Sequence, residues 1–364
     1  MVDLVEYPLP DYEGRPWSQW GQGVVGADGR FISAVGDHHG VDGNSFFFAF
    51  DPATLTLVRF SDVLSHTDHQ PGDFGYGKVH AQMVLGSCGE VYTHTYWGSR
   101  RNLEYGAAYR GDLLFRIDPA AEVMELLGVP EEERGTASMA GSPDGTMLYL
   151  EAVEPVSNQT DLVIYDVIER ETVATIVDPA HSGRRAMAVS EEGSVFFSSG
   201  SGDLSFYDPS TGEVSDTGSR LPGDMLRAAT YPGPDGTIVA VSRNPDEFFK
   251  IDPAGNVELL GEAPGYTASL AISQDGRHVY FIPGAHGNSW ERGTPLLDLD
   301  PESGDLKTIV ELAEPVAEAA GVRVGGTYSV VMDPAGGRLY IGLNVGEGDE
   351  SFGRVFLAIV ELPK

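Results

Sequence analysis

Residues 191–214 read EEGSVFFSSGSGDLSFYDPSTGEV, and this stretch decides the fold. A turn that ends in Gly193 leads into a short run of strand-forming residues, and a second such run ends in an Asp-Pro pair, which is a tight-turn signal. A third run of strand character, EVSDTG, follows that turn. The stretch therefore predicts consecutive antiparallel strands joined by tight turns.

The same unit recurs seven times along the chain, with spacings of 60, 56, 48, 43, 40 and 61 residues between its turn glycines. These glycines are Gly29, Gly89, Gly145, Gly193, Gly236, Gly276 and Gly337. Six units repeat the strand that ends in Asp, as in FAFDPATL and FFKIDPAG, and VFLAIVEL is the degenerate seventh copy. With the strand before each glycine turn, every unit supplies four strands. Residues 1–364 are therefore predicted to form one all-β domain, a seven-bladed β-propeller with four-stranded antiparallel blades.

The two ends of the chain are predicted to close the ring. The seventh unit reaches the C-terminus after three strands, and residues 2–9, VDLVEYPL, resemble the fourth-strand segment NVELLGEAP but belong to no unit of their own. We therefore expect residues 2–9 to form the outer strand of the seventh blade, which would remove two open sheet edges.

Composition excludes several classes of partner and structure. A net charge of −32 argues against binding to nucleic acid or anionic membranes, and no apolar run is long enough to span a bilayer. The single cysteine, Cys88, excludes an internal disulfide. The N-terminus lacks the basic and apolar regions of a secretory leader, so a cytoplasmic monomer is expected, although a processed secreted chain would look the same.

The histidines gather on one predicted face. In a propeller, the glycine and Asp-Pro turns share one face, here called the bottom, and the remaining connections surround the channel mouth on the top face. Eight of the nine histidines map to the top: His38, His39, His66, His69, His80, His94, His181 and His286. Arginines map there too: Arg100, Arg101, Arg184, Arg185, Arg227 and Arg292. A cationic, imidazole-rich mouth on an acidic body is expected to attract a small anionic substrate.

The segment KVHAQ and the segment YTHTYWG supply the central candidates. His80 and Gln82 are two residues apart at the start of the innermost strand of the second blade, so they face the same side, and His94 ends the neighbouring strand. These residues either bind a ligand or move protons in a shared site, or they are channel residues hydrogen-bonded to water. Together with His39 and His286, they would suit a divalent metal such as Mn, Fe, Ni or Zn.

The seven blades, the His-x-Gln motif and the histidine-rich mouth resemble the propeller lyases: the oligogalacturonate lyases, the ulvan lyases and, more distantly, the streptogramin B lyases. In oligogalacturonate lyases, three histidines and a glutamine hold a divalent metal. The resemblance implies that His80, Gln82, His94 and His286 hold one here. It also implies that a uronate-like substrate undergoes β-elimination.

Such a lyase must neutralise a carboxylate while the adjacent C–H proton is removed. The metal or Arg184, Arg185 or Arg227 would neutralise it, and Arg100 and Trp97 would also contact the substrate. His80 or His94 would take the proton, and Tyr96 or Tyr328 would protonate the leaving oxygen.

Two other classes of function stay open at this point. The first is a non-enzymatic propeller whose top binds a protein or a sugar through Tyr96, Trp97, Tyr105 and Trp290. The second is another metal-dependent isomerase or hydrolase on the same scaffold. The fold alone does not separate these classes.

Overall fold

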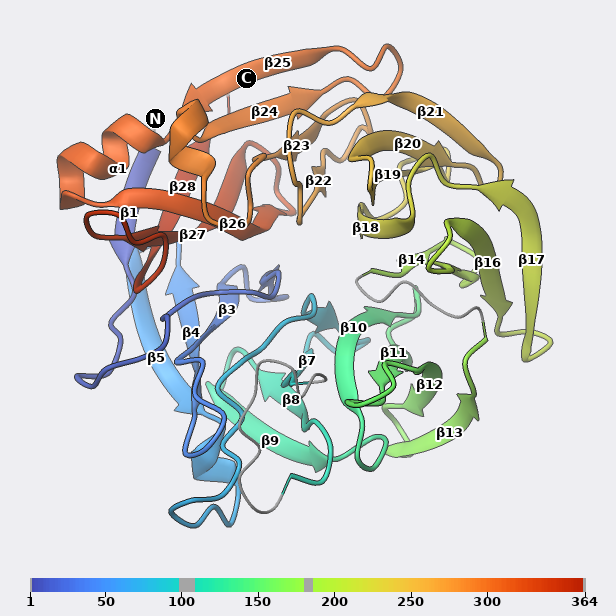
Figure 1. Cartoon of the computed structure of the whole chain (residues 1–364), viewed down its shortest axis with the longest axis horizontal. Helices are drawn as coiled ribbons and strands as arrows, with labels where there is room; N and C mark the ends of the chain where they lie inside the picture. The colour runs from blue at the N-terminus through green and yellow to red at the C-terminus, as the bar shows by residue number, and fades with distance from the viewer. Residues whose placement is uncertain (1, 98–108, 180–185, 363–364) are drawn as a thin grey trace.

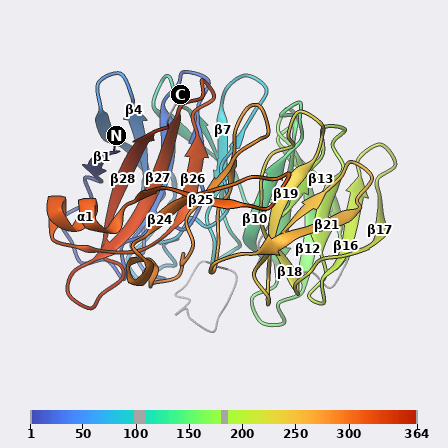
Figure 2. The same ribbon diagram turned by 90° about the horizontal axis from the view of Figure 1, so that it is seen from above.

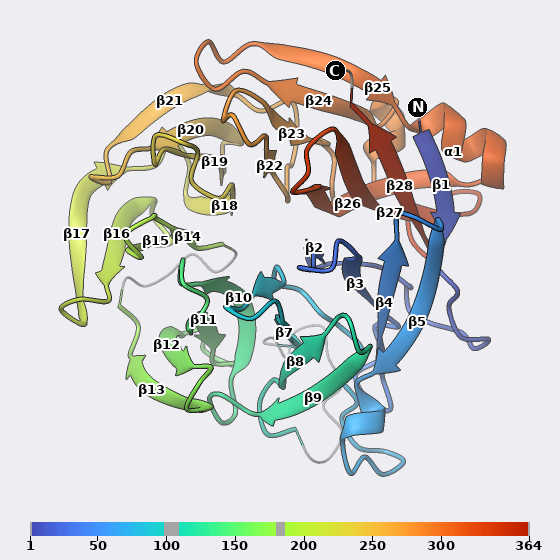
Figure 3. The ribbon, with the colours of Figure 1, turned by 180° about the vertical axis from the view of Figure 1, so that it is seen from behind.

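Seven four-stranded antiparallel sheets stand as blades around a central axis (Figure 1). The computed structural model describes residues 2–97, 109–179 and 186–362. In each blade the strands follow one another from the axis to the rim, as the view from behind also shows (Figure 3). The predicted seven-bladed propeller is therefore confirmed.

The blades contain the following strands, given from the axis outward. Blade one has β2 (Val24–Val25), β3 (Phe31–Gly36), β4 (Ser45–Asp51) and β5 (Thr56–Asp62). Blade two has β6 (Val84–Leu85), β7 (Val91–His94), β8 (Leu114–Asp118) and β9 (Val123–Gly128). Blade three has β10 (Gly135–Gly141), β11 (Met147–Val153), β12 (Thr160–Asp166) and β13 (Glu171–Ile176). Blade four has β14 (Ala188–Val189), β15 (Val195–Ser198), β16 (Asp203–Asp208) and β17 (Glu213–Arg220).

The remaining blades follow the same order. Blade five has β18 (Met225–Ala229), β19 (Ile238–Arg243), β20 (Glu247–Ile251) and β21 (Val257–Glu262). Blade six has β22 (Ala271–Ile272), β23 (Val279–Phe281), β24 (Pro295–Leu299) and β25 (Leu306–Glu311). Blade seven has β26 (Arg323–Met332), β27 (Arg338–Gly346), β28 (Arg354–Glu361) and β1 (Val2–Glu6).

The repeated turn residues explain why each unit folds back on itself. Gly193 has a φ of 92°, a conformation that favours glycine, and its N–H donates to the carbonyl oxygen of Ser190 over 3.0 Å. At the other turn, the carboxylate of Asp208 accepts the N–H of Ser210 over 2.8 Å. Aspartate is favoured at such turns because its side chain can satisfy this backbone donor.

The core lies between neighbouring blades rather than at the axis. Between blades seven and one, the ring of Tyr340 on β27 stacks on Phe31 of β3 with centroids 5.3 Å apart, and it meets Phe50 of β4 edge-on at 5.9 Å. All three rings are buried. Apolar burial of this kind fixes the blades to one another and keeps the axis open.

The N-terminal strand completes the last blade, as predicted. β1 pairs antiparallel with β28, with Val2 opposite Val360 and Glu6 opposite Phe356, and the two strands lie side by side in Figure 1. The Arg354 guanidinium holds both carboxylate oxygens of Glu6 at 2.6 and 2.8 Å.

One helix was not predicted from the sequence. α1 (Ala313–Ala320) lies between blades six and seven and ends at Gly321, which has a φ of 68°. It lies at the outside of the ring beside β1 and β28 (Figure 2). Short 3₁₀ turns also occur at Leu64–His66 and Ser289–Arg292. No helix within the described ranges is long and apolar enough to cross a membrane.

Candidate functional site

A small cavity of about 40 Å³ lies on the axis near the top of the channel, and all seven blades contribute to its wall. This mouth cavity is lined by Trp20, Gln22, His80, Ala81, Gln82, Ser138, Met139, Ala186, Met187, Arg227, Ala228, Ala229, Ala268 and Tyr328. No aspartate or glutamate is among these described lining residues, although the whole chain carries a net charge of −32. The mouth cavity therefore has the local charge expected of an anion site.

The positions of the larger lining side chains follow from the repeat. Trp20, His80, Arg227 and Tyr328 each stand nine residues before the turn glycine of their blade. They therefore occupy the same place at the top of the innermost segment in blades one, two, five and seven. In blade two this segment is extended but precedes the strand, because β6 begins only at Val84.

Among the described residues that line the mouth cavity, Arg227 is the one cation. It is only 4% exposed, its Nε donates to the Tyr266 hydroxyl over 2.6 Å, and its guanidinium lies over the rings of Tyr266 and Tyr328 at 4.9 and 5.8 Å. It forms no ion pair with any described carboxylate. A buried charge without a counter-ion is costly, so a bound anion would stabilise this arrangement.

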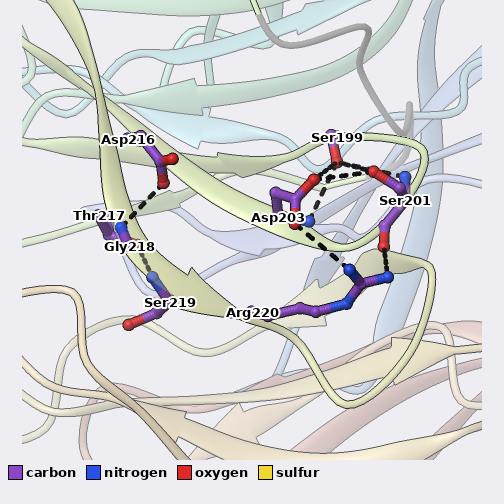
Figure 4. Close-up of polar contacts among 8 residues, drawn as sticks. All are labelled: Ser199, Ser201, Asp203, Asp216, Thr217, Gly218, Ser219 and Arg220. Atoms are coloured by element: carbon purple, nitrogen blue, oxygen red, sulfur yellow. Dashed lines mark hydrogen bonds and ion pairs between the residues drawn. The ribbon is translucent and has the colours of Figure 1, made fainter.

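Arg220 shows how an arginine on the same face is neutralised when no ligand is needed. Its guanidinium lies 3.6 Å from the Asp203 carboxylate and donates to the Ser201 carbonyl oxygen over 2.6 Å (Figure 4). The hydroxyl of Ser201 also donates to Asp203 over 2.9 Å. Arg220 is thus exposed and paired, whereas Arg227 is buried and faces the cavity.

His80 is fixed in one orientation by the neighbouring blade. The ring is 7% exposed, and its Nδ1 lies 2.9 Å from the carbonyl oxygen of Ala137 in β10. A carbonyl oxygen accepts only, so Nδ1 carries the proton and Nε2 is the basic nitrogen of the neutral ring. The ring of Tyr96 lies 4.9 Å away.

Tyr328 and His286 form a second pair. The Tyr328 side chain is 3% exposed and lines the mouth cavity, and its hydroxyl lies 2.7 Å from Nδ1 of the exposed His286. This contact connects a buried phenol to a histidine that reaches solvent, which is the arrangement needed to replace a transferred proton.

Trp20 and Lys78 were missed by the sequence analysis. The Trp20 ring packs against Tyr328 at 4.5 Å and His286 at 5.4 Å, and the ammonium of Lys78 lies 4.4 Å from its centroid. The shared nine-residue offset from the turn glycine was the signal that would have found Trp20. Lys78 carries no such signal, because only the folded ring brings it over an aromatic face.

His38 packs beside Trp20 and belongs to the support of the site. Its Nε2 lies 3.2 Å from the Ser18 hydroxyl, which also contacts the indole N–H of Trp20. Burial, with smaller repulsion from Lys78 and His39, holds the pKa of His38 well below its ordinary value. His38 is therefore a neutral ring that positions the aromatic layer.

Several predicted site residues lie elsewhere. His94 is 1% exposed, its Nδ1 lies 2.7 Å from the Thr95 carbonyl oxygen, and it does not line the mouth cavity. His39 contacts the Glu13 carbonyl oxygen over 2.9 Å. Trp97 is buried beside His38, with its backbone N–H bonded to Asp112. Arg100, Arg184 and Arg185 lie outside the described residues.

The metal site expected from His39, His80, Gln82, His94 and His286 stays a prediction. Across residues 2–97, 109–179 and 186–362, no group of three or more His, Cys, Asp or Glu side chains is placed to hold one metal ion. His80 and Gln82 line the mouth cavity, but His39 and His94 do not. A shared site for His80 and His94 stays a prediction, and the chemistry proposed below uses protein groups alone.

Comparisons with known proteins support the fold. No protein-family model and no curated protein matches the sequence. Among solved structures, the chain is similar to a structure described as streptogramin B lyase, with a TM-score of 0.61 and 11% sequence identity over 98% of this chain and 97% of that chain. The similarity extends over the whole ring and shows a shared architecture.

Proposed function

We propose that this protein is a carbon–oxygen lyase that binds a small carboxylate-bearing substrate at the mouth cavity and acts by β-elimination. The observation that carries the proposal is Arg227, a buried guanidinium that faces a cavity without a carboxylate among its described lining residues. The similarity of fold to streptogramin B lyase agrees with an elimination reaction but does not identify the substrate.

Each lining group has a role in this reaction. The substrate carboxylate lies on Arg227, which stabilises the extra negative charge as the adjacent C–H bond breaks. His80 Nε2 takes that proton, a carbon–carbon double bond forms, and the β-carbon–oxygen bond breaks. Tyr328 donates its phenolic proton to the departing oxygen, and His286 exchanges protons with solvent to restore it. The products are an unsaturated acid and an alcohol.

The test is an absorbance assay for the new conjugated double bond on a panel of uronate oligomers and other β-alkoxy carboxylates. Arg227→Met should abolish turnover and weaken binding of the carboxylate, since the buried cation is lost. Arg220→Met removes the same charge from the same face and should leave turnover unchanged, because Asp203 already neutralises Arg220. Equal activity in the two variants would contradict the proposal.

A binding module is the second candidate, and one observation favours it. Trp20 lies within an aromatic layer that contains His38 at 5.4 Å and the stacked ring of Phe352 at 5.6 Å, with Lys78 over its face. Aromatic layers of this kind also bind sugars or protein side chains. Tight binding of an acidic sugar with no double-bond formation would favour this candidate over the lyase.

A further inference from the structure

A second, larger cavity continues the channel toward the bottom face. This lower channel has a volume of about 740 Å³, and its wall includes Val24, Val84, Leu85, Val189, Ile272 and Met332. It shares Gln22, Gln82, Met187 and Ala229 with the mouth cavity. The two cavities are therefore consecutive parts of one passage along the axis.

The wall of the lower channel is mainly apolar. Glu191 is the only charged side chain among its described lining residues. Leu85 is 37% exposed although it lies inside this passage, so apolar surface is left open to solvent there. Covering such surface with an apolar group of a ligand is favourable, because water is released from both.

The junction between the two cavities is lined by two amide side chains, Gln22 and Gln82. Gln22 donates from Nε2 to the Val330 carbonyl oxygen over 3.3 Å, and the half-buried amide of Gln82 has no hydrogen bond to the described residues. The mouth cavity, at about 40 Å³, has room for only a few water-sized groups. The mouth cavity would therefore admit a slim unbranched chain more readily than a ring.

We propose that the lower channel binds the apolar tail of the substrate whose carboxylate lies on Arg227, so that the substrate is an amphiphilic, chain-like carboxylic acid. This inference rests on the proposed function, because it takes the anion site at Arg227 as the position of the head. The volume of the lower channel is within the range typical of small-molecule sites, about 300 to 1,000 Å³. The tail runs from the mouth through the junction into the apolar part.

The experiment measures the affinities of acetate, octanoate and dodecanoate by calorimetry on the full chain. Affinity should rise by roughly fourfold for each added methylene that becomes buried, the ratio that corresponds to about 0.8 kcal/mol. Val189→Trp should place an indole ring in the path of the tail and weaken this dependence on chain length. Val123→Trp introduces the same ring on the outer strand β9 and should leave the dependence intact. Leu85→Trp is a second variant of this kind, in case Val189→Trp does not fold.

The outcomes separate this inference from the proposed function. Equal affinities for the three acids, or a dependence on chain length that is unchanged in both Val189→Trp and Leu85→Trp, would overturn the lower channel as the tail site. Arg227→Met should weaken all three acids by a similar factor while the dependence on chain length remains. If Arg227→Met changes no affinity but chain length still matters, the anion site fails and the apolar site stands.

Discussion

At the scale of single residues, His94 and Asp112 lie in the same blade, and burial shifts their pKa values in opposite directions. Burial lowers the pKa of His94 to about 4, and it raises the pKa of Asp112 to about 7 despite three hydrogen bonds to the carboxylate. Their ordinary values are about 6.5 and about 3.9. Between about pH 4 and about pH 6.5, both groups are therefore uncharged in the folded protein and charged in the unfolded chain.

The two shifts have opposite effects on stability. For His94, the free energy of unfolding is highest at pH values above the pKa of the group in the unfolded chain. It decreases as the pH falls toward about 4, because the unfolded chain then binds a proton that the folded protein does not. For Asp112, the free energy of unfolding is highest at pH values below the pKa of the group in the unfolded chain. It decreases as the pH rises toward about 7, because the unfolded chain then loses a proton that the folded protein keeps. Between about pH 4 and about pH 6.5 the two slopes, each about 1.4 kcal/mol per pH unit, cancel.

Single substitutions should reveal each of the two slopes of the free energy of unfolding against pH. With His94→Gln, the free energy of unfolding should fall with rising pH relative to wild type, because only the Asp112 slope remains. With Asp112→Asn it should rise with pH. Urea unfolding at several pH values within the window measures both slopes. The free energy of unfolding of the double variant should differ from that of wild type by the same amount at every pH in the window. A single variant that parallels wild type would show that its group does not titrate as described.

Tyr328 offers a second prediction at this scale. Tyr328→Phe keeps the ring against Trp20 and removes only the proton donor, so kcat should fall on the order of 10²- to 10⁴-fold with little change in KM. Steady-state kinetics on any substrate that the wild type converts would measure this. His286→Gln should have a smaller effect on kcat, since water can replace an exposed histidine as the proton source.

At the scale of elements, β1 is the strand on which ring closure depends. Deleting residues 1–9 leaves β28 as an open edge, so the melting temperature should fall by at least about 5 °C and aggregation should increase. Thermal unfolding and light scattering would follow both effects. Glu6→Gln removes only the ion pair with Arg354 and should cost about 1 kcal/mol or less. Equal melting temperatures for wild type and the deletion would contradict the closure.

The blades could be predicted from the sequence because each carries its own local signals. The turn at Gly193 requires a left-handed conformation that glycine adopts easily, and the Asp208 carboxylate accepts the N–H of Ser210 in its own turn. Both signals therefore act within a few residues. α1 could not be predicted from these signals, because it is a short helix inserted between two β units. Its Val316 is buried in a core cluster formed by residues that are distant in the sequence.

The candidate site was predicted only in part for a related reason. Arg227, His80 and Tyr328 occupy equivalent positions in the repeat, so the sequence places them at the same height. His94 also ends its strand at the top, but its side chain is buried within the blade rather than in the mouth cavity. The direction of that side chain depends on strand pairing in blade two, which no local signal specifies.

At the scale of the whole molecule, the acidic body and the cationic mouth act on an anion over different distances. The Debye length shortens from about 30 Å at 0.01 M salt to about 10 Å at 0.1 M. Salt in this range therefore screens the distant carboxylates of a chain with net charge −32 before it screens Arg227. The association rate of octanoate should rise over this range and fall at higher salt. Stopped-flow fluorescence would measure it, and a monotonic fall would mean that the body does not repel the ligand.

The pairing of β1 with β28 also determines when the ring can form during synthesis. β1 begins at Val2 and β28 ends at Glu361, so the two strands can pair only after the roughly 360 residues that span them have been made. At about 5 to 20 residues per second, the first strand waits for tens of seconds without its partner. The other six blades can assemble on the growing chain, but the ring closes only when β28 becomes available to β1. A circular permutant that carries β1 after β28 would convert this last step into the formation of a local hairpin.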